Sequence, residues 1–218
     1  LREINRMAIA RTFGRQPGVS RADLTKETGL TKSTIGLLVQ DLVDEGWLFE
    51  SDLLATGAIG RRPTPLFMDG MRMAMIGAEV SLDSLNVLAV SLTGEVLDEM
   101  SEPLPGNRPE EEVISRLAEL TALLAGRIQK KQRRLLGLGV GVPGAVLDQS
   151  GVVKLAPNLA WRDVAFCDNL KHKLSELGIS DLRTLVQNDY DVAALGEHEF
   201  GEAPLPDPLV YLGLGVGV

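Results

Sequence analysis

An amide and a carboxyl group stand side by side where one predicted strand ends. Asn188 and Asp189 close the strand candidate "RTLVQND", and a helix is predicted from there to about Gly201. Another apolar strand candidate ends at Pro143 and Gly144. A carboxylate beside an amide and opposite such a loop can bind neighbouring hydroxyls, which is the usual design of a carbohydrate site. An N-cap for the following helix explains the same pair equally well.

A second group of polar residues stands at the starts of two short helices predicted near the N-terminus. Ser20 is suited to cap a helix that runs to about Thr28, and Asp23 can complete the capping interaction. Gly29 ends this helix, and Thr31 caps the next one. Two short helices joined at a glycine predict a helix-turn-helix, whose second helix enters the major groove of DNA by its N-terminal turn.

The helix that begins after Thr31 has one apolar and one polar face. Residues at helical spacing predict a buried stripe: Ile35, Leu38, Val39, Leu42 and Val43. The opposite face carries Ser33, Leu37, Gln40 and Asp44. On this face, Gln40 can read adenine with two hydrogen bonds, and Leu37 can touch a thymine methyl group.

A loop rich in glycine and arginine, "TGAIGRRP", separates the short strand candidates "WLFE" and "TPLFMD". The pattern predicts a wing, with Gly60, Arg61 and Arg62 at a tip that can lie along the minor groove. The predicted DNA contacts are Ser20, Arg21, Thr31, Lys32, Ser33, Thr34, Gln40, Arg61 and Arg62. The alternative is a three-helix module that serves an interface and exposes an ordinary solvated face.

Strands alternate with helices in the rest of the chain, which predicts an α/β domain. We expect helices at about 110–129 and 165–177, a loop over "AVLDQSGVVKLAPNLAW" and a last strand over "PLVYLGLGVGV". The predicted domains are residues 1–69 and 70–218.

Composition limits the classes of partner and site. The 218-residue chain has a net charge of −8, but nine basic and eight acidic residues occur in the first 66. Only this N-terminal part is therefore suited to DNA. One cysteine and two histidines give neither a disulfide framework nor a metal-ligand cluster. No apolar run is long enough to cross a bilayer and no signal peptide is evident, so we expect a cytoplasmic protein.

Several segments together resemble the ROK family, whose name covers repressors, unassigned reading frames and kinases. They are "GVSRADLTKETGLTKSTIGLLVQDLVDEGWLFE", "GRRP", "GLGVGVPGAV", "APNLAW" and "VQNDYDVAALGEHEFG". The resemblance implies an α/β fold in which a winged helix-turn-helix precedes a ribonuclease-H-like, actin-like sugar-binding domain. It also implies a chain truncated after Val218, with an incomplete second lobe. A structural zinc is expected only in the missing part, and no cofactor is required within this segment.

The resemblance also assigns residues of a sugar site. Gly144 would shape the pocket, and Asn158, Asn188 and Asp189 would hydrogen-bond sugar hydroxyls. Asp189 takes the place of the general base of the kinases. The resemblance therefore favours a ligand role over a helix cap for Asn188 and Asp189, whereas Asn158 by itself is more typical of a turn.

The first hairpin of this domain departs from the kinases of the family. They carry an aspartate, a glycine pair and a threonine where this chain has Glu79, Ser81, Leu82 and Asp83. Leu82 adds bulk, and Asp83 adds a negative charge, where a polyphosphate would bind. We therefore predict that the chain is not an enzyme.

The features combine into a sugar-responsive transcriptional regulator, which we expect to be a homodimeric repressor. Its partners would be operator DNA and a monosaccharide or sugar derivative. One alternative is an ATP-dependent sugar kinase of the ROK type with an appended DNA-binding domain. Another is a constitutive DNA-binding protein whose second domain serves only as a dimer scaffold.

Overall fold

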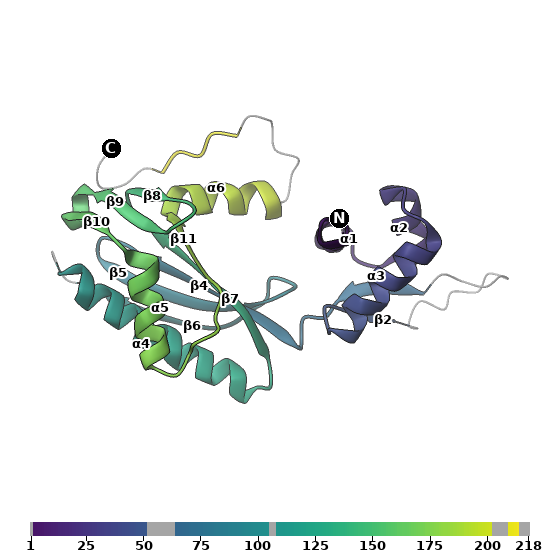
Figure 1. The fold of residues 1–218 in the computed structure, drawn as a ribbon, viewed down its shortest axis with the longest axis horizontal. Coiled ribbons are helices and arrows are strands. Elements are labelled where there is room, and N and C mark those ends of the chain that lie inside the picture. Colours follow the sequence, from purple (N-terminus) through teal and green to yellow (C-terminus); the bar gives the residue numbers. More distant parts are fainter. Residues whose placement is uncertain (1, 52–63, 105–107, 202–208, 214–218) are drawn as a thin grey trace. The chain divides into compact units, whose positions relative to one another are not determined.

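The computed structural model describes residues 2–51, 64–104, 108–201 and 209–213. The chain divides into two compact units, and most of their elements are labelled in Figure 1. The first unit comprises Leu1–Met73 and Leu92–Glu95. The second comprises Ala74–Ser91 and Val96–Val218.

The first unit consists of three helices and a small antiparallel sheet. The helices are α1 (Arg2–Arg15), α2 (Arg21–Thr28) and α3 (Lys32–Asp44). The strands are β1 (Val19–Ser20), β2 (Leu48–Glu50) and β3 (Pro65–Met68), in the order β1-β3-β2. The predicted strands "WLFE" and "TPLFMD" are confirmed. The pattern does not reveal β1, because two residues are too few to show alternation.

The predicted apolar stripe of α3 lies at the centre of the first unit's core. Its members Ile35, Leu38, Val39 and Leu42 are buried. They share one cluster with Ile9 and Phe13 of α1, Leu24 of α2 and Leu66 of β3. Two ion pairs, Arg2–Asp41 (2.5 Å) and Arg6–Glu45 (2.5 Å), also join α1 to the C-terminal end of α3. The core and these ion pairs hold the polar face of α3 toward solvent.

The connection between α2 and α3 has the predicted caps. The Ser20 hydroxyl accepts a hydrogen bond from the Asp23 N–H, and the Asp23 carboxylate accepts one from the Ser20 N–H, which completes a capping box. Gly29 ends α2 with φ at 69°, in the left-handed region that glycine tolerates. Thr31 caps α3 by accepting from the Thr34 N–H (3.3 Å). These three helix-boundary predictions are confirmed.

The second unit is built on a five-stranded sheet with the order β11-β7-β4-β5-β6. Its strands are β4 (Met73–Val80), β5 (Ser84–Ser91), β6 (Val96–Pro103), β7 (Arg134–Val142) and β11 (Thr184–Asn188). Strands β4, β5 and β6 pair antiparallel, whereas β11 runs parallel to β7. The carboxyl ends of β7 and β11 therefore meet at one edge of the sheet.

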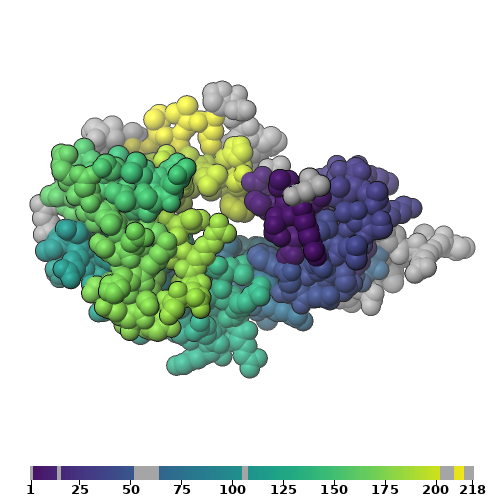
Figure 2. Space-filling view, viewed as in Figure 1, coloured from purple at the N-terminus to yellow at the C-terminus, as the bar shows by residue number. Residues whose placement is uncertain are grey.

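Two long helices cover this sheet and complete its core. Helices α4 (Glu110–Lys130) and α5 (Phe166–Glu176) pack against each other (Figure 1), close to the positions predicted for them. Their buried residues, such as Leu117 and Leu170, join Ile76, Val87 and Val140 of the strands in one cluster. Helix α6 (Asp189–Phe200) begins directly after β11 and has no buried residue, and Figure 2 shows it at the surface.

The predicted loop after β7 is wrong. The segment contains a second sheet of β8 (Ala145–Leu147), β9 (Val152–Ala156) and β10 (Trp161–Val164), in the order β10-β9-β8. A short 3-10 helix, η1 (Pro157–Leu159), connects β9 to β10. Val153 and Trp161 are buried in the main core, so the segment packs onto the unit. Strands of three to five residues show too little alternation for the pattern to reveal them.

The predicted last strand is also wrong where it can be compared with the structure. The stretch 209–213 contains no strand, and residues 208 and 214–218 of that prediction lie outside the described ranges. A strand requires a paired neighbour, and no described strand is hydrogen-bonded to this stretch. None of the helices in the described ranges is both long enough and apolar enough to span a membrane.

Candidate functional site

The start of α3 presents a group of exposed hydroxyls. The Thr31 hydroxyl lies 2.9 Å from the hydroxyl oxygens of both Ser33 and Thr34, and it also accepts from the Thr34 N–H. Lys32 is exposed beside them. A helix N-terminus carries orphan N–H groups and a partial positive charge, so hydroxyls and an ammonium there suit a phosphate or a base edge. The structure brings these four predicted residues together.

The exposed face of α3 continues this polar surface. Ser33, Gln40 and Asp44 are exposed, and Leu37 is 70% exposed although it is apolar. The Gln40 side-chain amide donates from Nε2 to Asp44 Oδ1 at 2.8 Å. The two-faced helix predicted from the spacing is confirmed, and the bond between Gln40 and Asp44 is a feature that the prediction missed.

The start of α2 is arranged differently from the start of α3. Ser20 is only 3% exposed, and its hydroxyl is used within the capping box, which is a different role from the DNA contact expected of it. Arg21 forms an ion pair with Glu50 of β2 at 2.6 Å, with its side chain partly exposed. Arg61 and Arg62, at the predicted wing tip, lie outside the described residues.

Asn188 links two parts of the second unit at the edge where β7 and β11 end. Its Oδ1 accepts from the N–H groups of Tyr190 (2.9 Å) and Asp191 (3.1 Å), so it caps α6. Its Nδ2 donates to the carbonyl oxygen of Gly144 at 2.8 Å. The helix-cap interpretation of Asn188 is therefore confirmed, and a contact between Asn188 and a sugar stays a prediction.

The backbone conformation and close packing at position 144 require a glycine. Its φ is 107°, where side chains are strained, and a Cβ at this position would overlap the Leu155 carbonyl oxygen and lie 2.8 Å from Ala156 Cα. The backbone of the Pro-Gly turn thus lies directly against β9, and Asn188 holds it there. This close packing gives Gly144 a structural reason that is independent of any ligand.

Asp189 lies next to the ends of two other strands. A Cβ built on Gly141 of β7 would lie 3.3 Å from Asp189 Cα and 4.0 Å from the carbonyl oxygen of Ala78 in β4. Partial burial raises the pKa of the Asp189 carboxyl, and the nearby carboxylates of Glu79 and Asp191 raise it further, against a lowering by the Tyr190 N–H. A carboxylate with a raised pKa is a better proton acceptor for a hydroxyl.

The contact of Gly141 with Asp189 is a feature that the sequence reasoning missed. Gly137, Gly139 and Gly141 alternate along β7, so they share one face of the strand. The alternation was the available signal, since a glycine inside a strand often marks close approach of another backbone.

Asn158 is less closely connected to this site. It lies in η1, is exposed, and has no side-chain hydrogen bond to another described residue. Its link to the others is Ala156, two residues earlier, which packs against Gly144. The structure thus brings Gly144 into contact with Asn188, the chain neighbour of Asp189, whereas the position of Asn158 near a ligand stays a prediction. Among the residues that the structure describes, no cluster of His, Cys, Asp or Glu is suited to a metal ion.

The turn between β4 and β5 uses its polar groups internally. The Ser81 N–H donates to the Ser84 carbonyl oxygen at 2.8 Å, so this amide is committed to the turn. The Glu79 carboxylate accepts from the Ser81 hydroxyl (3.1 Å) and from Asn86 Nδ2 (3.2 Å). Leu82 packs against the main core. A phosphate would have to displace the bond to Ser84 before it could bind the Ser81 amide.

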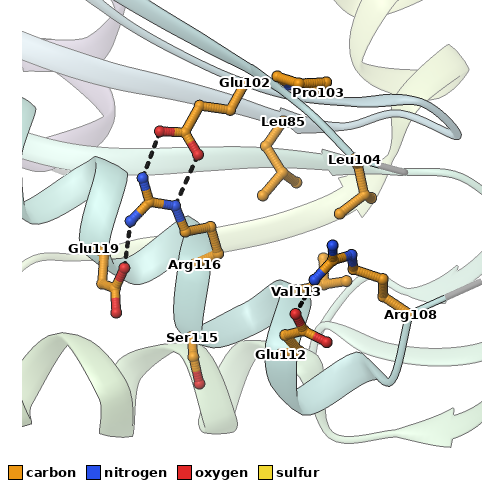
Figure 3. A pocket seen from close by; sticks show the side chains of 10 residues that line it. All are labelled: Leu85, Glu102, Pro103, Leu104, Arg108, Glu112, Val113, Ser115, Arg116 and Glu119. Atoms are coloured by element: carbon orange, nitrogen blue, oxygen red, sulfur yellow. Dashed lines mark hydrogen bonds and ion pairs between the residues drawn. The ribbon is translucent and has the colours of Figure 1, made fainter. Parts of the chain in front are cut away.

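A separate pocket of about 280 Å³ lies between β6 and α4 (Figure 3). Its two cations are both paired: Arg116 bonds Glu102 and Glu119, and Arg108 bonds Glu112. The guanidinium of Arg116 holds the pKa of the Glu102 carboxyl below its ordinary range. None of the predicted site residues lines this pocket, and its paired charges leave no net positive charge for an anion.

The sequence is similar to one protein family and to curated proteins that are longer than this chain. A family model described as "ROK family" matches residues 75–218. The xylose repressor of Caldicellulosiruptor bescii is 28% identical over 218 residues, which cover all of this chain and 53% of that protein. The N-acetylglucosamine repressor of Escherichia coli O6:H1 (strain CFT073) is 23% identical over 222 residues, with coverage of 100% and 53%. The chain thus spans about half the length of these curated relatives.

A solved structure has the same fold over most of the chain. It is a ROK family transcriptional regulator described as a homologue of the E. coli MLC protein. The match has a TM-score of 0.71 and 20% sequence identity, and it covers 90% of this chain and 49% of that one. The α/β fold of this regulator is therefore the fold of the present chain.

Proposed function

The chain belongs to the ROK family, and from this premise we propose that it is a sugar-responsive DNA-binding regulator, acting as a repressor. The observation that carries the proposal is the extent of the match to curated repressors, which covers all of this chain. The family model alone matches residues 75–218, so the helices α1, α2 and α3 and their small sheet lie outside it. The match to the named repressors therefore extends over the N-terminal part of the chain as well.

The first unit is the proposed winged helix-turn-helix. Its support is the capped pair α2 and α3 with the exposed face of α3, followed by the strands β2 and β3 that would carry a wing. The recognition helix would enter the major groove through Thr31, Lys32, Ser33 and Thr34. Two half-sites one turn apart would be bound by a homodimer.

The second unit is the proposed sugar sensor. Asp189 would accept a hydrogen bond from a sugar hydroxyl, within the site that Asn188 and Gly144 hold in place. The sugar would release DNA only to the extent that it prefers the DNA-free state, typically by about 1–3 kcal/mol. The proteins named above suggest xylose and N-acetylglucosamine as the first compounds to test.

The test is a fluorescence-anisotropy titration of the full-length protein on labelled DNA from its own upstream region, at fixed salt and without ATP. D-xylose, N-acetylglucosamine, glucose and their phosphates are added in turn. We expect one of them to release the DNA. DNA binding that no compound changes would favour a scaffold role for the second unit.

Two variants assign the response to the site. Asp189→Ala is expected to abolish release by the sugar while DNA affinity without sugar is kept. Asp181→Ala, at an exposed position of the same unit, is the matched control and should respond like the wild type. A normal sugar response in Asp189→Ala would contradict the proposed role of Asp189.

The kinase alternative rests on the same Asp189 carboxylate, whose raised pKa suits a general base. The β4–β5 turn argues against it, because the Ser81 amide is committed to Ser84 and Leu82 packs on the core. ATP-dependent phosphorylation of a sugar that the full-length protein binds would support the kinase. Sugar binding with no turnover of ATP would support the regulator.

A further inference from the structure

The exposed face of α3 contains one side-chain hydrogen bond whose geometry bears on base recognition. Gln40 and Asp44 lie one turn apart on this face, and Gln40 Nε2 donates to Asp44 Oδ1 at 2.8 Å. The opposite face of the helix is buried through Leu38, Val39 and Leu42. The bonded pair therefore stands at the surface, and Gln40 is three residues from Leu37, which is also exposed.

A carboxylate neighbour fixes the orientation of a glutamine amide. An ionised Asp44 has only acceptors, and the amide has donors on Nε2 and an acceptor at Oε1. Turning the amide over would bring Oε1 against Oδ1, so the carboxylate selects one of the two orientations. Nε2 carries two hydrogens, and the bond to Asp44 uses one of them. The amide keeps Oε1 and one N–H for a partner outside the helix.

That pair of groups matches one base. Adenine offers a donor at N6 and an acceptor at N7 in the major groove, and a glutamine binds both at once. Guanine offers two acceptors, N7 and O6, so an amide held in this orientation would set Oε1 against O6. We propose that Asp44 is a positioning residue that holds the Gln40 amide to read an adenine. The proposal rests on the proposed DNA-binding function.

Asp44 has no comparable role in the stability of the unit. It is the last residue of α3, where a negative charge opposes the helix dipole. The nearby acids Asp41 and Glu45 pair with Arg2 and Arg6. No ion pair of Asp44 occurs among the described residues. Its carboxylate would also repel DNA phosphates, so it should weaken binding to every sequence while it sharpens the choice of one base.

The opposite signs of these two effects make the proposal testable. Full-length protein is first used to select bound duplexes from a randomised DNA pool, and the best duplex is then varied at each base pair. The position read by Gln40 is the one whose preference is lost in Gln40→Ala. At that position we expect adenine to be preferred by about 5- to 150-fold, the range of one good bidentate contact.

The variants separate positioning from charge. Asp44→Ala should reduce the adenine preference roughly five-fold or more while it raises affinity for unrelated DNA. Asp41→Ala is the matched control, because it removes a carboxylate from the same turn that pairs with Arg2 and not with the Gln40 amide, and it should keep the adenine preference. Asp44→Glu should restore much of the preference. The double variant Gln40→Ala/Asp44→Ala should be no less selective than Gln40→Ala alone.

Each other outcome has a distinct meaning. An unchanged adenine preference in Asp44→Ala would overturn the proposal and leave the DNA-binding function intact. The same holds if Gln40→Ala changes no preference, or if the base read is guanine. Failure of the wild-type protein to select any sequence would instead contradict the proposed function itself. Circular dichroism of each variant tests whether the total helix content of the protein is unchanged.

Discussion

Helices α3 and α6 both begin with a polar cap, yet the two starts differ in what surrounds them. At α3, Thr31 caps the helix among the exposed hydroxyls of Ser33 and Thr34. At α6, Asn188 caps the helix and at the same time binds the Gly144 carbonyl oxygen, with Asp189 partly buried beside it. Both helices are capped by a side-chain oxygen. The start of α3 is exposed to solvent, whereas the start of α6 is hydrogen-bonded to the turn after β7.

We therefore expect substitutions at the start of α3 to affect DNA binding and substitutions of the α6 cap to affect stability. Apart from the cap Thr31, residues at the start of α3 should change with little effect on folding, and their loss should be detected in DNA binding. Asn188, the cap of α6, holds the turn after β7 through Gly144, so its loss should be detected first in stability. Four predictions test this contrast, from the largest expected effect to the smallest.

Replacing Gly144 should cause the largest loss of stability. In Gly144→Ala the new methyl group meets the backbone of Leu155 and Ala156 at a φ of 107°, so we expect a loss of about 3–5 kcal/mol. The control is Gly178→Ala, where φ is 85° but no atom lies within 4 Å of the new group. It should cost only about 1 kcal/mol. Equal losses in urea denaturation would show that close packing is not the reason for Gly144.

The two caps should differ in their contribution to stability. Asn188→Ala removes the cap of α6 and the bond to Gly144, with an expected cost of about 2 kcal/mol, whereas Thr31→Ala removes one cap at about 1 kcal/mol. Asn188→Ser keeps a capping oxygen without the donor to Gly144 and should fall between. Urea denaturation followed by circular dichroism gives these values. A cost at Thr31 above that at Asn188 would reverse the comparison.

Lys32 should matter for DNA and not for folding. It is exposed at the first turn of α3, so Lys32→Gln should change stability by less than about 0.5 kcal/mol. It should weaken binding to all sequences and lower the slope of log Kd against log salt by about 1, as expected for one lost phosphate contact. Lys154→Gln, an exposed lysine of the second unit, is the control and should leave the slope unchanged.

Asp189 should give the smallest effect on stability, with a defined pH dependence. Its raised pKa means that the folded state disfavours the carboxylate, so the ionised group lowers stability at neutral pH. Asp189→Asn should therefore be slightly more stable than the wild type at pH 7. The gain should shrink as pH falls from the raised pKa toward the ordinary value near 3.9, below which both states are protonated. Thermal melts over this range would measure it, and a gain that grows on acidification would contradict the burial of Asp189.

Local rules predict much of this fold from the sequence. Ser20, Gly29 and Thr31 mark helix ends because capping depends on a few neighbouring residues, and the stripe on α3 depends only on helical spacing. The sheet of β8, β9 and β10 was missed because its strands are short and its stability comes from packing against the core. The contact of Gly141 with Asp189 depends on which strands are neighbours, and no local pattern states that.

The candidate site was predicted in part for the same reason. The sequence marks Asn188 as a polar residue at a strand end, and both a cap and a ligand fit that position. Its bond to Gly144 joins residues 44 positions apart in the chain, so only the fold reveals it. The amide of Gln40 was predicted to face DNA, but its bond to Asp44 depends on side-chain conformations that spacing alone does not fix.

The central claim is that a sugar site and a DNA-binding surface are coupled within one protein. The most direct test is calorimetric titration of the effective sugar into the full-length protein, with and without saturating operator DNA. Linkage requires that the DNA weaken sugar binding by the same factor by which the sugar weakens DNA binding, about 5- to 150-fold. That reciprocal change is the result we predict. Equal sugar affinities with and without operator DNA would contradict the account.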